Sequence, residues 1–270
     1  MNLTSPTQVK QWCIENEFHP NKILGQNFLI DRNVLLAIVE AGLEKAPPSP
    51  KILEIGPGLG VLTEELLKRS SLVVAVEKDK ILAQRLKESL GNPEYLTVLA
   101  ADATVYVENT MPEFDAMVSN LPYQAGTRIL LSLACGRNIP VMTALVQTEV
   151  AERLAAKEGS KVRSLSGLWA QLDNDVEIIR KVPASCFWPR PEIASSVVRL
   201  TRHDRNLQLS EEKRKFFRNI TKRAFAHRRK QLGSIFRDMI KSAKRAEELS
   251  NEDWLLLVDE IMNVEKEHGK

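Results

Sequence analysis

Short apolar runs alternate with longer amphipathic stretches through the middle of the chain, between Lys51 and Leu200. The runs have the length of β-strands, and continuous apolar runs are typical of parallel strands buried on both faces of a sheet. Seven runs fit this description, at residues 51–55, 72–77, 96–102, 114–120, 141–146, 176–182 and 196–200. The pattern therefore predicts a seven-stranded sheet.

Helical stretches fill the gaps between the earlier runs, at residues 60–70, 80–90, 126–135 and 146–157. Parallel strands need crossover connections of this kind, so the alternation predicts βαβ units. Only a proline-rich loop separates the last two runs, which indicates an antiparallel pair closing one edge of the sheet. The expected fold class is α/β, with a Rossmann-like seven-stranded sheet whose last strand is antiparallel.

Two domain boundaries are visible. Prolines at 47, 48 and 50 indicate a hinge between the N-terminal segment 1–50 and the sheet, and a polar stretch at 201–206 follows the last strand. Beyond it, helical patterning occurs at residues 209–228, 230–242 and 254–262. We predict an α/β domain at residues 1–203 and a small all-α domain at residues 204–270.

Composition excludes several classes of protein. Hydrophobic residues make up 43% of the 270 and charged residues 27%, close to the averages of globular domains. No apolar stretch of about 18 residues and no signal or organelle presequence is visible, so we expect a cytoplasmic protein without a membrane segment. The three cysteines and four histidines are scattered without metal-ligand spacing, and we expect no metal.

The small net charge of +3 conceals a local excess of basic residues. Residues 201–245 hold 15 Lys and Arg against 4 Asp and Glu, whereas residues 1–200 hold 21 against 23. Such a cluster indicates either a face that binds a polyanion or the solvated side of a helix, and charge alone does not separate the two.

The most regular motif is Glu54-Ile55-Gly56-Pro57-Gly58-Leu59-Gly60, between a predicted strand and a predicted helix. Glycines there allow a tight turn and close approach of a ligand. The G-x-G-x-G spacing differs from the dinucleotide motif G-x-G-x-x-G, which favours a nucleoside cofactor without a pyrophosphate; the alternative is a turn alone. Glu77 ends the next strand, where its carboxylate could accept both ribose hydroxyls or be merely solvated.

Two later strand ends carry further candidates. Asp102 could accept a hydrogen bond from an adenine amino group or simply cap a helix. Asn120-Leu121-Pro122-Tyr123 suits methylation of an exocyclic adenine amine, whose lone pair is delocalised into the ring. The Asn120 amide oxygen and the Leu121 carbonyl could accept its two hydrogens and free that pair, while Tyr123 offers a stacking face and Pro122 stiffens the loop. The alternative is an ordinary strand-end turn.

With these motifs, the chain resembles the ribosomal RNA adenine dimethyltransferase family, which modifies two adjacent adenines near the 3′ end of small-subunit RNA. Leu24-Gly25-Gln26-Asn27-Phe28-Leu29 and the blocks at 146–154 and 224–232 also match, so the likeness covers almost everything from Lys22 to Arg237. The resemblance implies S-adenosylmethionine as cofactor, contacts from Asn27 and Leu29, and an F-x-P-x-P loop whose Phe187 stacks on the target base. A buried phenylalanine is the alternative for Phe187.

The predicted site residues fall into three groups. The catalytic group is Asn120, Leu121, Pro122, Tyr123 and Phe187. The cofactor group, covered by the N-terminal segment 1–50, is Gln26, Asn27, Leu29, Gly56, Gly58, Gly60, Glu77, Lys78, Asp102, Ala103 and Asn120. The RNA-binding group is Arg153, Lys161, Arg190, Lys222, Arg223, Arg228, Arg229 and Lys230.

Two departures from the family pattern bear on the substrate: Gln124-Ala125-Gly126 replaces Asn-Ile-Ser, and Val162-Arg163-Ser164 replaces Tyr-Gly-Arg.

The expected function is dimethylation of two adjacent adenines of 16S rRNA by a monomer acting on the small ribosomal subunit. Alternatives are a large-subunit enzyme of the erythromycin-resistance type and a non-catalytic nucleic-acid-binding or ribosome-assembly relative. An NAD-dependent dehydrogenase is disfavoured, since its glycine motif and hydride-transfer site are missing.

Overall fold

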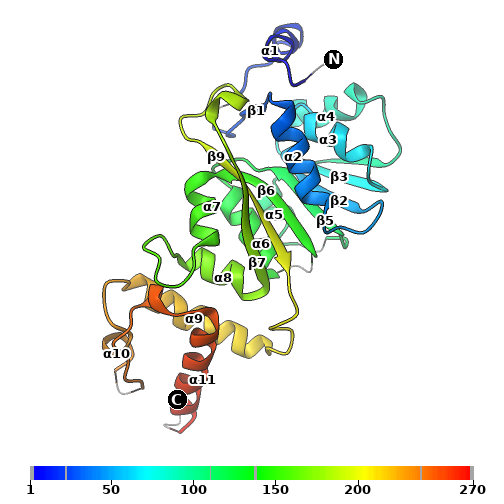
Figure 1. Cartoon of the computed structure of the whole chain (residues 1–270). Coiled ribbons are helices and arrows are strands. Elements are labelled where there is room, and N and C mark those ends of the chain that lie inside the picture. Colours follow the sequence, from blue (N-terminus) through cyan, green and yellow to red (C-terminus); the bar gives the residue numbers. More distant parts are fainter. Residues whose placement is uncertain (1–2, 22, 110, 137–138, 238, 268–270) are drawn as a thin grey trace. The chain divides into compact units, whose positions relative to one another are not determined.

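The structure is a computed structural model that describes residues 3–21, 23–109, 111–136, 139–237 and 239–267. It forms two compact units (Figure 1). The first contains Met1–Ala151 and Asp175–Arg202, and the second contains Glu152–Asn174 and His203–Lys270. The segment Glu152–Asn174 thus groups with the C-terminal residues, although we had assigned it to the α/β domain. The division of functions between residues 1–203 and 204–270 stays a prediction.

The first unit is built on the predicted seven-stranded sheet. Its strands are β2 (Lys51–Ile55), β3 (Leu72–Glu77), β4 (Leu96–Ala100), β5 (Ala116–Asn120), β6 (Val141–Gln147), β7 (Asn174–Val182) and β9 (Ser195–Arg202), in the order β4-β3-β2-β5-β6-β9-β7. The pairs from β4 to β6 are parallel and β9 runs antiparallel to β6. Because β2 pairs with both β3 and β5, the strand order reverses there, which opens a crevice at the carboxyl ends of these strands.

Helices alternate with the strands much as predicted. They are α2 (Arg32–Leu43), α3 (Val61–Leu67), α4 (Lys80–Ser89), α5 (Ala103–Tyr106), α6 (Gly126–Gly136) and α7 (Thr148–Ala155). Helix α2, which we did not predict, packs on β5 and β6, and α4 packs on β3 and β4. Aspartates cap both: Asp31 accepts from Val34 N, and Asp79 from Ile81 N and Leu82 N.

The N-terminal segment is tied to the proline-rich loop by a short two-stranded ladder. Strand β1 (Phe28–Leu29) runs antiparallel to β8 (Phe187–Trp188), so that Leu29 pairs with Phe187. A 3-10 turn, η1 (Ala184–Cys186), precedes β8, and helix α1 (Pro6–Glu15) lies upstream of β1. Residues of α1 join a separate apolar cluster with members of the first unit, namely Val9, Cys13, Phe18, Phe28, Leu59 and Leu82.

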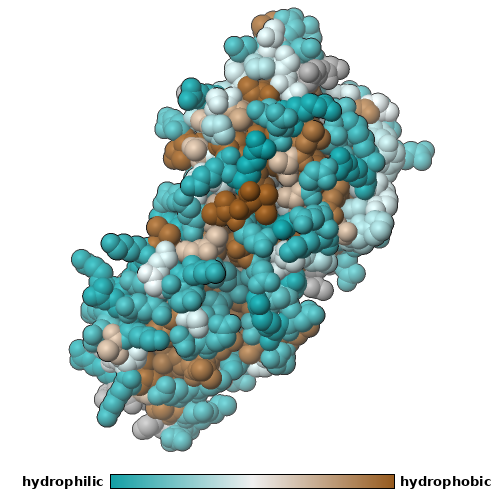
Figure 2. Space-filling model, viewed as in Figure 1, coloured by the Kyte–Doolittle hydropathy of each residue, from teal (hydrophilic) through white to brown (hydrophobic). Residues whose placement is uncertain are grey.

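The second unit is helical around its own core. It contains α8 (Leu165–Asp173), α9 (Glu211–Ala226), α10 (Leu232–Ile235), η2 (Ala246–Glu248) and α11 (Asn251–Glu267), and large buried side chains include Phe217, Phe236 and Trp254. Hydrophilic side chains cover much of its face in Figure 2, with apolar patches between them. The helix predicted at 230–242 was wrong beyond Ile235, where the chain folds back so that the carbonyls of Ser242 and Lys244 accept from Gly233 N and Leu232 N.

Two kinds of feature are absent from the described residues. None of their helices combines the length and apolarity that crossing a membrane requires. They also hold no group of three or more His, Cys, Asp or Glu side chains placed to bind a metal ion.

Candidate active site

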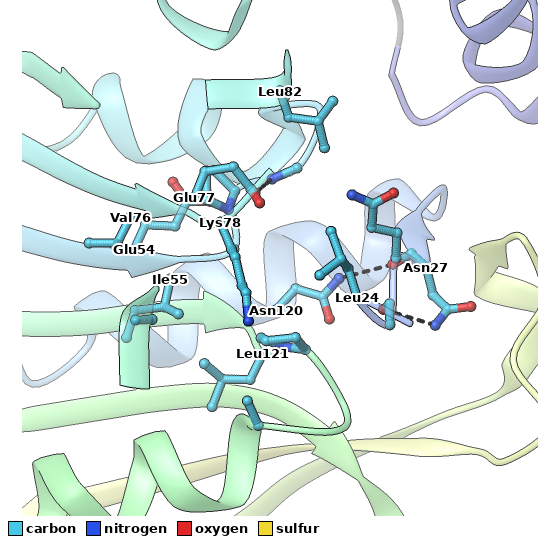
Figure 3. Close-up of a pocket in the computed structure, with 18 of the residues that line it drawn as sticks. Leu24, Asn27, Glu54, Ile55, Val76, Glu77, Lys78, Leu82, Asn120 and Leu121 are labelled. Atoms are coloured by element: carbon cyan, nitrogen blue, oxygen red, sulfur yellow. Dashed lines mark hydrogen bonds between the residues drawn. The ribbon is translucent and has the colours of Figure 1, made fainter. Parts of the chain in front are cut away.

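A cavity of about 280 Å³ opens at the carboxyl ends of β2, β3 and β5 (Figure 3). Its wall contains the predicted cofactor residues Gln26, Asn27, Leu29, Gly56, Gly58, Glu77, Lys78, Asp102, Ala103 and Asn120, and also Leu121, Pro122 and Tyr123. Segments that are far apart in the sequence thus meet in one site. Gly60 and Phe187 are the two predicted cofactor or catalytic residues that this wall does not include.

The glycine-rich turn has the backbone that its sequence predicts. Gly56 and Gly58 both have positive φ angles, of 68° and 58°. A Cβ on Gly58 would lie 3.1 Å from the Phe28 ring, so glycine keeps this wall of the cavity open. Gly60 has a different role: it caps α3 at φ 88°, and a Cβ there would lie 2.5 Å from Leu86. It shapes the turn rather than the cavity.

Two buried carboxylates lie beside this turn. Glu77 accepts hydrogen bonds from Gly58 N at 3.1 Å and Asp79 N at 2.9 Å, yet burial raises its pKa above the ordinary value. Glu54 is only 1% exposed, and its Oε2 has no hydrogen-bond partner. Burial raises the pKa of Glu54 to about 8, and the charge of Glu77 adds to this effect. A hydrogen bond with Thr63 acts against this rise in pKa. The carboxyl group of Glu54 at the cavity wall thus keeps one oxygen, Oε2, without a hydrogen-bond partner.

Lys78 and Asp102 form an ion pair at the cavity wall, with Nζ 2.8 Å from Oδ2. The other oxygen of Asp102 accepts from the Thr104 backbone N and hydroxyl, so Asp102 caps α5 as the alternative interpretation expected. The Lys78 hydrogen bond lowers the pKa of Asp102 to about 2. Asp102 is thus an ionised acceptor at the wall of the cavity.

Asn120 is oriented by the N-terminal segment. Its Nδ2 donates to the Asn27 carbonyl at 3.3 Å, and Asn27 Nδ2 donates to the Gly25 carbonyl at 3.2 Å, as the dashed lines in Figure 3 show. Gln26 bonds to Asp79 at 2.9 Å, which holds the same segment against α4. Because the amide nitrogen of Asn120 is engaged, its oxygen is the end left for an amino group in the cavity.

Phe187 lies in the core rather than in the cavity. Its side chain is 2% exposed and belongs to the same apolar cluster as Leu29, with which it pairs across β1 and β8. This is the buried phenylalanine of the alternative interpretation, and the cause is the β1–β8 ladder. Phe187 supports Leu29, which lines the cavity, and Tyr123 is the predicted stacking residue in the cavity wall.

The predicted RNA-binding residues are divided between the units: Arg190 is in the first and the other seven are in the second. Lys222, Arg229 and Lys230 are exposed. Two others have structural partners. Arg223 donates to the Ile235 carbonyl at 3.0 Å and lies 5.1 Å from the Phe236 ring, and Arg228 donates to the Lys161 carbonyl at 2.5 Å.

The two departures from the family pattern have different surroundings. Gln124 and Ala125 line the cavity next to Tyr123. Arg163 is 1% exposed and donates to the Ala156 carbonyl at 3.0 Å and to Asn251 Oδ1 at 2.8 Å. The first departure thus alters the cavity wall. The second places a buried arginine that joins residues 156 and 251 of the second unit by hydrogen bonds.

Three residues of interest were absent from the predicted site: Glu54, Gln124 and Ser195. Glu54 carried a signal, since it is an acid in an otherwise apolar strand just before the glycine turn. Ser195 carried none, because its contact with Tyr123 crosses 72 residues of sequence.

The fold and the cavity define a Rossmann-like methyltransferase: the sheet has an antiparallel β9, a glycine turn follows β2 and an acid ends β3. The model of the family described as "Ribosomal RNA adenine dimethylase" matches residues 17–268, and the chain belongs to this family.

Curated relatives and solved structures are similar over most of the chain. "Ribosomal RNA small subunit methyltransferase A" of Chlamydia abortus is 35% identical, covering 93% of this chain and 90% of its own. The protein of the same name from Deinococcus radiodurans is 40% identical, covering 73% of this chain and 67% of its own. The crystal structure of a dimethyladenosine transferase from Plasmodium falciparum superposes with a TM-score of 0.75 at 22% identity, covering 89% of this chain and 98% of that one. This last likeness shows a shared fold.

Proposed function

We propose that the protein transfers methyl groups from S-adenosylmethionine to N6 of two adjacent adenines near the 3′ end of 16S rRNA, giving N6,N6-dimethyladenosine in the small ribosomal subunit. The observation that carries the proposal is the convergence of Asn120 to Tyr123 with Glu77 and the glycine turn in one cavity. Family membership and the names of the curated relatives support the substrate.

The residues of the cavity fit the proposed cofactor. Gly58 lets the turn approach the Phe28 ring of the cavity wall more closely than a Cβ would allow, and Glu77 offers a carboxylate of the kind that accepts ribose hydroxyls. Asp102 would accept from the adenine amine of the cofactor, and the unpartnered Oε2 of Glu54 suits the ammonium of its methionine part. When bound, S-adenosylmethionine supplies an electrophilic methyl group on a sulfonium.

The chain itself would activate the target amine. The oxygen of Asn120 and the carbonyl of Leu121 would accept the two N6 hydrogens, which turns the nitrogen lone pair out of the ring plane and toward the methyl group. Tyr123 would hold the base by stacking, an interaction worth roughly 1–3 kcal/mol. The same two acceptors can orient the amine for the first methylation, and the remaining single hydrogen would bond to one of them for the second.

The basic residues of the second unit would contact phosphates. Lys222, Arg229 and Lys230 are exposed and belong to the basic excess of residues 201–245. These residues would strengthen binding to RNA without selecting a base, since phosphate contacts are independent of sequence. The assignment of a monomer and of a cytoplasmic location rests on sequence alone and stays a prediction.

Labelled methyl transfer tests the proposal. Purified protein is incubated with S-adenosylmethionine carrying a labelled methyl group and, in parallel reactions, with small subunits lacking the modification and with unmodified large subunits, and the RNA of each reaction is digested to nucleosides. We expect N6-monomethyladenosine to appear first and N6,N6-dimethyladenosine to replace it. Label confined to large-subunit RNA would favour the erythromycin-resistance type of activity, and RNA binding without label would indicate a non-catalytic assembly factor. Asn120→Ala, which removes the acceptor, should bind RNA but transfer no methyl.

A further inference from the structure

Tyr123 is tied to the sheet by a hydrogen bond that the proposed chemistry does not require. Its hydroxyl lies 2.6 Å from the hydroxyl of Ser195, the first residue of β9. Ser195 is 0% exposed, so its side chain is out of contact with solvent in the structure. The tether therefore joins a wall residue of the cavity to the interior of the first unit.

The hydrogen bond fixes the orientation of the Tyr123 ring, which the backbone alone does not determine. Tyr123 lies in the turn between β5 and α6, where the Pro122 carbonyl accepts from Gly126 N at 2.7 Å and from Ala125 N at 3.2 Å. These bonds place the Tyr123 Cα, but the two side-chain torsions of a half-buried ring remain free. A partner at the far end of the ring removes that freedom.

Ser195 is held firmly enough to act as an anchor. It pairs with Gln147 in the β6–β9 ladder, and Thr148 N bonds to the Ala194 carbonyl at 3.0 Å. A functional group mounted on a strand is placed more exactly than one on a loop. The ring of Tyr123 is consequently positioned by the sheet rather than by its own turn.

We propose that Ser195 is a positioning residue for methyl transfer: its hydroxyl holds the Tyr123 ring in the plane on which the target adenine stacks. The inference rests on the proposed function and adds a residue to that site. Stacking orients the adenine while Asn120 and Leu121 accept its N6 hydrogens, so looseness of the ring misaligns N6 with the methyl group. Cofactor binding, which uses other walls of the cavity, does not depend on Ser195.

Single-turnover and steady-state kinetics of four variants test the inference with labelled S-adenosylmethionine and unmodified small subunits. Ser195→Ala and Tyr123→Phe each remove one partner, and the double variant removes both. Ser196→Ala is the matched control: Ser196 is the next residue, is equally buried, and pairs with the Thr148 hydroxyl at 3.0 Å, outside the cavity wall. Calorimetry of S-adenosylmethionine binding and thermal unfolding accompany each variant.

We expect Ser195→Ala and Tyr123→Phe each to lower the rate of methyl transfer about three- to tenfold, the effect of losing one neutral hydrogen bond. The double variant should be no slower than the slower single variant, because the two changes break the same interaction. KM and Kd for S-adenosylmethionine should stay within about twofold of the parent, and Ser196→Ala should keep the parent rate.

Additive losses in the double variant, or equal losses in Ser195→Ala and Ser196→Ala, would overturn the inference and leave Ser195 a merely structural residue. Tyr123→Phe keeps the buried strand intact, so a parent-like rate for it would also overturn the inference even if Ser195→Ala folds poorly. Failure of the unchanged protein to methylate either ribosomal subunit would be a different result, which defeats the proposed function itself.

Discussion

Replacing Glu54 by glutamine tests whether its buried carboxyl group lowers the free energy of unfolding while it strengthens binding of S-adenosylmethionine. A pKa of about 8 in place of the ordinary 4.5 means that the folded chain keeps a proton that the unfolded chain has released. The folded state therefore binds more protons between these two values, and its stability falls as pH rises from about 4.5 to about 8. At 1.36 kcal/mol per pKa unit the cost above pH 8 is on the order of 5 kcal/mol, an upper estimate for a buried group.

Glu54→Gln keeps the shape and removes the titration. Below about pH 4 the variant and the parent should unfold in urea with free energies within about 1 kcal/mol, since both side chains are then neutral in the folded and in the unfolded chain. At pH 8.5 the variant should be the more stable by several kcal/mol. Glu88→Gln removes an exposed carboxylate on α4 and is the control, for which we expect no such divergence.

Binding should change in the opposite direction. If Glu54 meets the ammonium of S-adenosylmethionine, it must ionise on binding, so at pH 7.5 the parent should release part of a proton. Calorimetry in two buffers of different ionisation enthalpy measures that release. The variant should release less and bind roughly 10- to 100-fold more weakly, the worth of a hydrogen bond to a charged group. A stability difference that is constant from about pH 4 to pH 8.5 would refute the raised pKa of the buried Glu54 carboxyl.

Five further substitutions, two of them comparisons, have defined outcomes. Gly60→Ala should lower the free energy of unfolding by roughly 2–3 kcal/mol. Gly91→Ala should lower it by about 1 kcal/mol, because φ is positive there too but a Cβ would meet nothing within 4 Å. A smaller loss for Gly60→Ala than for Gly91→Ala would contradict the predicted clash with Leu86. Arg163→Ala should cost about 3 kcal/mol in urea unfolding, because buried carbonyl and amide acceptors lose their donor. Arg229→Ala should weaken binding of any RNA and lower the slope of log K against log salt by about 0.7, whereas Arg223→Ala should chiefly lower the melting temperature.

The sheet and most of the cavity could be predicted because their signals are local. A parallel strand buried on both faces is a continuous apolar run, and a nucleoside-binding turn needs its glycines in sequence. Helix α2 was missed, since the apolar run Val34–Val39 is of strand length and does not separate a buried helix from a strand. Helix α8 was missed because Gly167 argues against a helix; its missing Cβ lets α8 approach the Arg153 carbonyl.

The parts of the site that escaped prediction depend on contacts between distant residues. Strands β1 and β8 have two residues each and lie about 160 apart in sequence, so nothing local shows that Phe187 pairs with Leu29 and is buried. The Tyr123–Ser195 bond is of the same kind. Gly60 belongs to the predicted motif, but its function in packing against Leu86 follows only from how α3 and α4 are placed.

Locating the methyl groups on ribosomal RNA tests the central claim most directly. Small subunits lacking the modification are incubated with the protein and S-adenosylmethionine, and nuclease fragments of the RNA are analysed by mass spectrometry. The account predicts two adjacent adenines in one fragment near the 3′ end of 16S rRNA, each with two added methyl groups, and an unmodified fragment with Asn120→Ala. Methyl groups elsewhere in 16S rRNA, or an Asn120→Ala protein as active as its parent, would contradict it.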